Sequence, residues 1–491
     1  MSLSSTTRPA TSEGRAGQYP GVVLAVIVAC QMMVVVDATA MAVALPEIQS
    51  GLHFSPTGLA WVLNAYILPY AGLLLLGGRT GDVFGRRRTF VAGVALFTAS
   101  SLLGGLAPSP GWLLAARALQ GVGAAFAAPG AMSLLMANFA EGPARNRALA
   151  GYSTVAGLGM AIGMIASGVL TDVASWRWVL LVNVPIGLAI VVLTPRLVAE
   201  PPRNPGRLDV PGALAATAGL SVLAWAFINA SAHGWGGATP VALVAAAVLL
   251  ALFVLRQSRA AQPLMPLRLL ADRNRTSGYL AMAFTMASNF TISLFVPMFL
   301  QDVLHYSALS AGLAFLPMAL TVFVVSRSTR RLLPLWGPRP LILGGLVLCA
   351  VGIGWLSRLD GGSSYAGGVL VPLFLLGLGI GTFLMPLTGL ILGGVPPQDA
   401  GAASGVLQTF QQSGGALGIA VLITVYGSSL RHAAPDTPRA AATAHGIGAA
   451  FTGATAFLLL ALLLIALTAL PLRRAAGAGA GAAAPQGSGS S

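Results

Sequence analysis

Long apolar runs, separated by short polar segments, make up most of this 491-residue chain. A helix that crosses a membrane needs about 20 consecutive apolar residues, and runs of this length predict fourteen such helices. The predicted spans are 21–45, 58–78, 89–108, 112–138, 148–171, 177–195, 210–231, 239–256, 276–301, 309–326, 339–357, 366–393, 401–427 and 447–472. The pattern therefore predicts an all-α polytopic membrane protein.

Two six-span sets repeat each other weakly at an offset of about 250 residues, with a pair of spans between them. Gly85-Arg86-Arg87 recurs as Gly337-Pro338-Arg339, each time after the second span of a set. Parallel repeats are typical of transporters whose substrate site lies between the halves. We expect a cytoplasmic tail at 1–19, a six-helix half at 20–195, an inserted pair at 209–257, a second half at 275–472 and a disordered cytoplasmic tail at 475–491.

The composition argues for a membrane protein and against several other classes. Hydrophobic residues make up 56% of the chain and charged residues 8%, whereas soluble domains carry about 25% charged residues. The net charge of +14 comes from arginines clustered between apolar runs, so we expect no nucleic-acid partner. The chain has no lysine, which excludes a P-loop and leaves an ion gradient or a partner as the energy source, with no cofactor. Cys30 and Cys349 lie in apolar runs and predict no metal site.

The arginines also predict the orientation in the membrane. With a cytoplasmic N-terminus, 22 arginines lie inside and 4 outside, and Arg117 alone lies within a span. Cytoplasmic loops are enriched in arginine and lysine. We therefore expect both termini in the cytoplasm of a multi-pass protein of the cell membrane.

The segment 77–88 between the second and third spans holds four arginines and one carboxylate. Such charges are too costly in hydrocarbon, so we predict a cytoplasmic loop. Its repeat carries Pro334 in the place of Asp82, and only the first copy can form an internal ion-pair network. We predict a cytoplasmic gate formed by Gly78, Asp82, Gly85, Arg86 and Arg87.

Asp37 is the only acidic residue well inside a predicted span, about seven residues from the outer end. A carboxylate there is costly unless it is paired, protonated or exposed to a water-filled cavity. Arg117 lies about five residues from the outer end of the fourth span, at a similar depth. We predict that the two pair and carry proton coupling. The alternatives are that Asp37 caps a neighbouring helix and that Arg117 snorkels to the interface.

The fifth span is rich in glycine, and Gly159, Gly163 and Gly168 predict a tight contact between the halves or ordinary helix packing. Aromatic and amide side chains within spans are candidates for a substrate cavity. Most such residues serve packing or the interfacial belt. The candidates are Trp61, Asn64, Tyr66, Asn289, Phe290, Gln408 and Gln411.

Several motifs together resemble the major facilitator superfamily, in its fourteen-helix drug:proton antiporter branch. Residues 78–88 are similar to its loop motif, DATAMAVALP at 37–46 to its first-helix motif and RALQGVG at 117–123 to its fourth-helix motif. Residues 159–168 resemble its antiporter motif, although Met164 and Ser167 stand where proline and glycine are usual. Further matches are Trp176-Arg177-Trp178, Asn183-Val184-Pro185-Ile186-Gly187 and the region 397–418.

The resemblance implies a monomeric exporter of amphipathic drugs or antibiotics that exchanges them for protons. It implies proton coupling by Asp37 and Arg117 and a conformational lock at 78–88. A nutrient symporter of the same fold is the alternative. A membrane-embedded enzyme or sensor is a remote alternative, because we find no catalytic constellation. The substrate stays open, since Asp37 could favour cations or serve protons only.

Overall fold

The computed structural model describes residues 20–468, except 56–57, 140–141, 202, 204–205, 261, 397–398, 433, 435 and 437. The regular structure in the described residues is helical, without a strand. The expected tails at 1–19 and 475–491 lie outside the described residues. The predicted all-α fold is confirmed.

The first set of helices, in the described residues before position 200, has seven members. They are α1 (Pro20–Leu52), α2 (Ala60–Phe84), α3 (Arg86–Gly105), α4 (Pro110–Asn138), α5 (Pro143–Val173), α6 (Arg177–Leu181) and α7 (Asn183–Leu197). The next elements are α8 (Val210–His233), α9 (Ala238–Arg259) and the short helix η2 (Leu267–Leu270). The last set is α10 (Arg273–Asp302), α11 (Ala308–Leu313), α12 (Leu316–Trp336), α13 (Pro338–Leu356), η3 (Tyr365–Leu370), α14 (Val371–Leu392), α15 (Ala400–Arg431) and α16 (Arg439–Thr468).

Thirteen segments of the described chain are long and apolar enough to cross a membrane. They match thirteen of the fourteen predicted spans; α6 with α7, α11 with α12 and η3 with α14 each make one span. The remaining predicted span corresponds to α5, a helix of 31 residues whose side chains are described in part. The count of fourteen therefore stays a prediction.

Polar residues at the helix ends define several of these boundaries. The Ser109 hydroxyl accepts a hydrogen bond from the Trp112 amide at 3.4 Å, and Pro110 follows as the first helical residue of α4. Asp272 accepts a hydrogen bond from the Arg275 amide at 2.7 Å at the start of α10. These caps satisfy amides that have no partner within the first helical turn.

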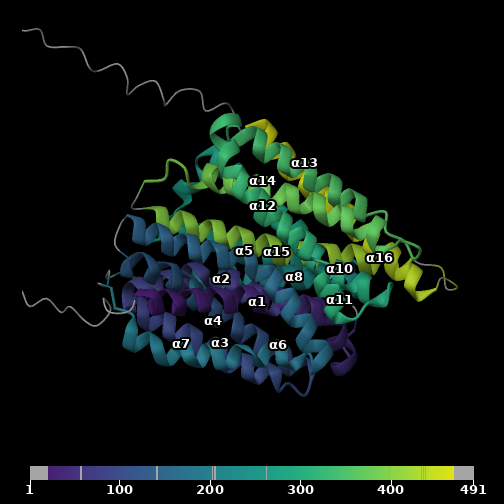
Figure 1. The fold of residues 1–491 in the computed structure, drawn as a ribbon, viewed down its shortest axis with the longest axis horizontal. Helices are drawn as coiled ribbons and strands as arrows, with labels where there is room; N and C mark the ends of the chain where they lie inside the picture. The colour runs from purple at the N-terminus through teal and green to yellow at the C-terminus, as the bar shows by residue number, and fades with distance from the viewer. Residues whose placement is uncertain are drawn as a thin grey trace, which may run out of the picture.

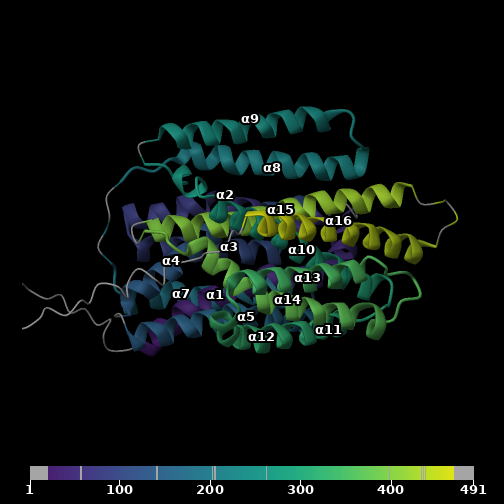
Figure 2. The ribbon, with the colours of Figure 1, turned by 90° about the horizontal axis from the view of Figure 1, so that it is seen from above.

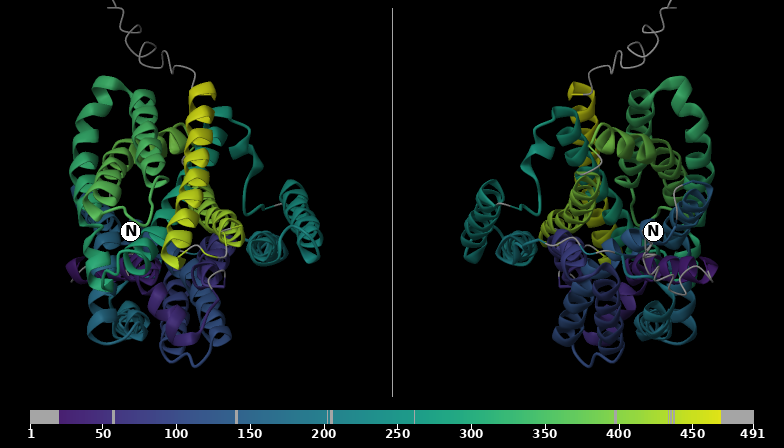
Figure 3. Two further views of the ribbon diagram at one scale, coloured as in Figure 1. Left: turned by 90° about the vertical axis from the view of Figure 1, so that its right-hand side faces the viewer. Right: turned by 90° about the vertical axis from the view of Figure 1, so that its left-hand side faces the viewer.

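The helices run side by side along the long axis of the molecule (Figure 1). In that view α3, α4, α6 and α7 lie on one side and α12, α13 and α14 on the other. Helix α8 packs against both α2 and α15, and α9 packs on α8 at the edge of the bundle (Figures 2 and 3). The pair α8–α9 thus covers a seam between the first and the last set of helices.

Asp209 fixes the start of α8 to the end of α9. Its carboxylate accepts hydrogen bonds from the Arg256 guanidinium, from the Gly212 amide and from the Gln257 side chain. Burial raises the pKa of Asp209, but these hydrogen bonds outweigh it and hold the pKa below its ordinary value.

The predicted loop at 77–88 is wrong as a description of the backbone. Helix α2 continues through this segment to Phe84, α3 begins at Arg86, and Gly85 alone is non-helical. At 1.5 Å per residue α2 is about 37 Å long, several ångströms more than the hydrocarbon core. A helix can therefore carry these charges beyond the hydrocarbon without unwinding. Gly85 has a backbone φ of 112°, a value that residues other than glycine rarely adopt.

Candidate functional site

Asp37 and Arg117 form a buried ion pair between α1 and α4. The distance between Arg117 Nη1 and Asp37 Oδ2 is 2.6 Å, and the side chains are 0% and 1% exposed for Asp37 and Arg117. The structure thus brings together the two charges that the sequence placed at one depth, and Arg117 does not reach the surface. A buried pair needs further hydrogen bonds to offset its desolvation.

Neutral side chains of α4 itself and of α7 provide these bonds. Gln120 Nε2 and Asn183 Nδ2 donate to Asp37 Oδ1 at 2.7 Å and 3.0 Å. Gln120 Oε1 also accepts from Arg117 Nη1 at 2.6 Å, while Gln120 Nε2 reaches the Ser101 hydroxyl at 2.8 Å. Sequence reasoning missed Gln120, although it lies three residues after Arg117 and hence on the same helix face. Asn183 lies in one of the motifs that resemble the family, but the sequence alone indicated no role for it.

Tyr66 lies between this ion pair and the interior cavity. The guanidinium carbon of Arg117 lies 4.4 Å from the centre of the Tyr66 ring, within the range of a cation–π contact. The Tyr66 hydroxyl, Arg117 Nη2 and both polar atoms of Asn64 are buried without a hydrogen-bond partner in the described part of the chain. Buried polar atoms of this kind can bond a mobile proton carrier such as water.

Asp37 lies deeper in its helix than the sequence predicted. Helix α1 continues past the predicted end at residue 45 to Leu52, fifteen residues beyond Asp37. The predicted span followed the hydropathy, which drops at Pro46-Glu47, but the helix continues through both. Asp37 therefore lies near the middle of a 33-residue helix.

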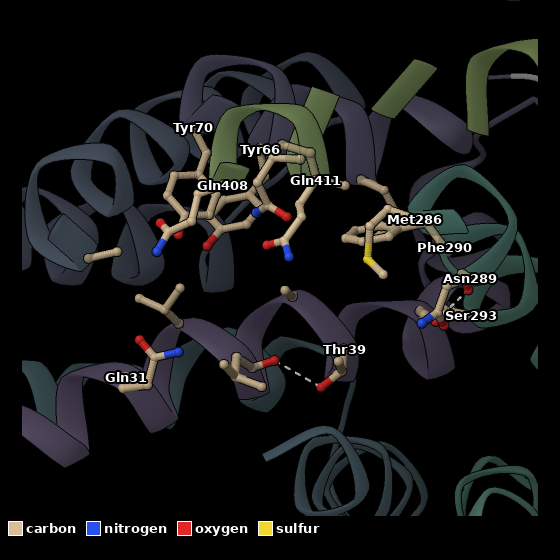
Figure 4. A pocket seen from close by; sticks show the side chains of 18 of the residues that line it. Gln31, Thr39, Tyr66, Tyr70, Met286, Asn289, Phe290, Ser293, Gln408 and Gln411 are labelled. Carbon is tan, nitrogen blue, oxygen red and sulfur yellow. Dashed lines mark hydrogen bonds between the residues drawn. The ribbon is translucent and has the colours of Figure 1, made fainter. Parts of the chain in front are cut away.

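An interior cavity of about 330 Å³ lies between the first and the last set of helices. Its lining residues come from α1, α2, α4 and α5 of the first set and from α10 and α15 of the last set. Figure 4 shows Gln408 and Gln411 on α15 across the cavity from Gln31 and Thr39 on α1. Asn289 and Ser293 of α10 lie at one end of this view.

Five of the seven predicted cavity residues line this space and two do not. Those that line it are Tyr66, Asn289, Phe290, Gln408 and Gln411. On α2 the lining face is formed by Leu63, Tyr66, Ile67 and Tyr70, which follow helical spacing. Asn64 is fully buried on a different face and Trp61 packs half-buried against the core, so their assignment to the cavity is wrong. Tyr152 and Gln31 line the cavity and were not predicted, and Gln412 lines it next to Gln411.

The arginine cluster at the α2–α3 junction forms a local ion-pair network. Arg86 donates to Asp82 from Nε at 3.1 Å and from Nη2 at 3.0 Å, and Arg79 lies 3.9 Å from the same carboxylate. Arg87 lies 3.6 Å from Glu200, whose carboxylate also accepts from the Arg87 amide. A Cβ on Gly85 would lie within 3.3 Å of the Glu200 carboxyl group.

Gly77, and not Gly78, makes the close approach at the end of α2. A Cβ on Gly77 would lie 2.0 Å from the Ala125 carbonyl oxygen of α4. A Cβ on Gly78 would meet only Pro129, at an ordinary 3.6 Å. The close packing of α2 against α4 therefore requires glycine at position 77 and not at position 78.

The glycines of α5 contact two different neighbours. Cβ atoms on Gly159 and Gly163 would clash with Val35 and Thr39 of α1, at 2.8 Å and 2.2 Å. A Cβ on Gly168 would lie 2.6 Å from the Leu309 Cα of α11. Of the two alternatives, ordinary packing within one helix set therefore holds for Gly159 and Gly163, which face α1, and a contact between the helix sets holds for Gly168.

Contacts beside Gly168 join the first and the last set of helices at the end of the molecule opposite the arginine cluster. The Asp172 carboxylate accepts hydrogen bonds from the Ala308 and Leu309 amides, each at 3.0 Å. Gln301 Nε2 donates to the Val43 carbonyl at 3.0 Å, which joins α10 to α1. A carboxylate on the first amides of a helix is stabilised by their partial positive charge.

The described residues contain no cluster of histidine, cysteine, aspartate or glutamate that could hold a metal ion. Cys30 and Cys349 are buried and unpaired.

Comparison with known proteins identifies the family and several relatives. The model of the Major Facilitator Superfamily matches residues 27–419. The chain is 44% identical over 475 residues to the cephamycin export protein of Amycolatopsis lactamdurans, covering 95% of this chain and 96% of that protein. It is 42% identical over 447 residues to the puromycin resistance protein of Streptomyces alboniger, covering 90% and 88%.

Solved structures agree at the level of the fold. A bacterial homologue of the human lysosomal transporter Spinster, inward-facing and unoccupied, has a TM-score of 0.65 at 17% identity, covering 92% of this chain and 97% of that chain. A structure of the POT family transporter PepTSo also reaches 0.65, at 14% identity and with 91% of this chain and 97% of that chain covered. At these identities the likeness shows the arrangement of helices alone.

Proposed function

This chain belongs to the Major Facilitator Superfamily, and we propose that it exports amphipathic drugs or antibiotics across the cell membrane in exchange for protons. The observation that carries the proposal is its near full-length similarity to proteins named for cephamycin export and puromycin resistance. The cavity of about 330 Å³ between the helix sets is of a size that small-molecule sites have. The chain is a multi-pass membrane transporter and not an enzyme.

Asp37 is the proton carrier in this proposal. While it is charged, the carboxylate holds Arg117, Gln120 and Asn183 in one hydrogen-bonded cluster. A proton on Asp37 removes the negative charge that offsets the buried guanidinium, and the cluster then has to rearrange. Because the cluster joins α1, α4 and α7, the rearrangement changes the packing of the helices around the cavity.

Tyr66 links the cavity to the proton site. Its side chain lines the cavity and also covers the guanidinium of Arg117. A substrate in the cavity therefore contacts the Tyr66 ring directly, and a proton on Asp37 affects the same ring through Arg117. This shared contact gives a route by which occupancy of one site changes the other.

The contacts of Asp172 and Gly168 support a conformation that is closed at their end of the molecule. We infer that this end faces outward and that substrate enters from the arginine-rich end in the cytoplasm. The proposed halves, 20–195 and 275–472, rock about the cavity, and the cluster at Asp82, Gly85 and Arg86 forms the cytoplasmic gate. The protein acts as a monomer in the bilayer with both termini in the cytoplasm.

Expression in a pump-deficient, drug-sensitive bacterium tests the proposed export. The expected result is a higher inhibitory concentration for at least one compound in a panel of antibiotics. A panel with no change for any compound would contradict drug export. Proteoliposomes under opposite proton gradients distinguish the antiporter from a symporter, because only an antiporter accumulates substrate on the side from which protons leave.

A further inference from the structure

The interior cavity is built from side chains without charge. Its described lining residues include aliphatic, aromatic, hydroxyl and amide side chains, and none is acidic or basic. The part of α5 whose side chains are described incompletely also contributes no charge, because residues 148–171 include no acidic or basic residue. A charged ligand in this space would leave water without meeting an opposite charge.

The charges nearest to the cavity are already paired with each other. The Asp37 carboxylate is fully buried and accepts three hydrogen bonds, from Arg117, Gln120 and Asn183. Arg117 is 1% exposed and lies behind the ring of Tyr66. Neither residue is part of the cavity wall, so neither can neutralise a substrate while the ion pair is formed.

Amides give the cavity its polar character. Gln408, Gln411, Gln412 and Asn289 line it and have no side-chain hydrogen bond within the described residues. Each amide supplies two donors and one acceptor oxygen. Gln31 is oriented by the Tyr152 hydroxyl, which donates to its Oε1 at 2.6 Å, so its NH₂ group remains for a ligand. Figure 4 shows Gln408 and Gln411 on α15 across the cavity from Gln31 on α1.

We propose that this transporter, if it exports drugs as proposed above, selects amphipathic molecules that carry no formal charge and that bond to the opposed amides of α1 and α15. Apolar side chains such as Val34, Met286 and Phe290 bind the hydrophobic part of the substrate. Asp37 then serves protons only and does not act as a counter-ion for cationic drugs. Gln411 of α15 is a specificity-determining residue.

The test compares uncharged with permanently charged compounds. Everted vesicles from a pump-deficient host are assayed for uptake of chloramphenicol and linezolid, which are uncharged, and of tetraphenylphosphonium and ethidium, which are permanent cations. We expect transport of the uncharged pair to exceed that of the cations by about tenfold or more, because the cavity offers no counter-charge. Equal or better transport of the cations would overturn the inference and leave drug export intact. Transport of neither class would contradict both.

A substitution that adds a negative charge to the cavity wall tests the same inference by a gain of function, namely the uptake of a cation. Gln411→Glu places a carboxylate in the cavity wall and is expected to create uptake of tetraphenylphosphonium while uptake of chloramphenicol falls. Gln411→Met keeps the size without the amide; it is expected to lower chloramphenicol uptake and to create no cation uptake. A Gln411→Glu protein that reaches the membrane, still transports chloramphenicol as the wild type does and gains no cation uptake would overturn the role of Gln411.

Discussion

At the scale of single residues, Asp37 and Arg117 form an ion pair that is almost fully buried between α1 and α4. Asp37 and Arg117 could be found from sequence because charges inside spans are rare. Gln120 and Asn183 could not be found with the same certainty, because neutral amides in spans have many possible partners. The cavity residues could be predicted in part. Helical spacing shows which residues share one face of a helix, but only the packed structure shows that Tyr66 faces the cavity and Asn64 does not.

The ion pair predicts a specific pattern of stability. Arg117→Met leaves Asp37 buried without its counter-charge and is expected to lower the free energy of unfolding by about 3–5 kcal/mol. Adding Asp37→Asn to that variant removes the unpaired charge and is expected to recover most of the loss. Thermal unfolding of the purified proteins in detergent measures both. A double variant less stable than Arg117→Met would contradict the pairing.

Asp82 tests the proposed gate. Its carboxylate accepts two hydrogen bonds from Arg86, and Asp82→Asn removes the charge that holds the arginine cluster together. We expect a slower transport rate with unchanged substrate binding, measured as initial uptake rate and equilibrium binding. Asp360→Asn, at an exposed carboxylate in the segment between α13 and η3, is the matched control. An unchanged rate for Asp82→Asn would end the gate hypothesis.

At the scale of elements, hydropathy located the helices and misjudged their ends. Helices α1 and α2 continue beyond their predicted spans because hydrogen-bonded backbone can extend into water with polar side chains on it. The segment 77–88 illustrates this, since its four glycines and four arginines predict a loop and Gly85 alone leaves the helix. Which neighbour each glycine of α5 contacts depends on packing, which the sequence does not contain.

Gly168 is expected to be essential where α5 meets α11. In Gly168→Val the side chain would enter the backbone of α11, from which a Cβ would be only 2.6 Å away, so the closed end cannot form. We expect transport to fall by about tenfold or more with near-normal membrane insertion. Gly151→Val is the control in the same helix, because the nearest atom to its Cβ is 4.0 Å away. Equal effects of the two variants would contradict the contact.

At the scale of the whole molecule, the family and the all-α fold could be predicted from the order of motifs and spans. The division into halves at 20–195 and 275–472 and the orientation remain predictions. The position of α8 over the seam between α2 and α15 could not be predicted, since the sequence shows an inserted pair without a partner. Its contact with both helices ties the pair to the helices that line the cavity.

The orientation can be measured by labelling single cysteines. With Cys30 and Cys349 replaced by alanine, Ser364→Cys lies between α13 and α14 and is expected to react with an impermeant maleimide in intact cells. Ser258→Cys, at the arginine-rich end of α9, is expected to react only after lysis; both positions are exposed. The opposite labelling pattern would reverse the topology.

The central claim is that Asp37 couples substrate export to proton entry, and gradient-driven flux in proteoliposomes tests it most directly. Wild-type protein is expected to accumulate chloramphenicol, or the antibiotic that the growth panel selects, against its gradient when a proton gradient is imposed. Asp37→Asn is expected to lose this accumulation while it still exchanges labelled for unlabelled substrate, which shows that the variant is folded and binds. Full gradient-driven accumulation by Asp37→Asn would contradict the account.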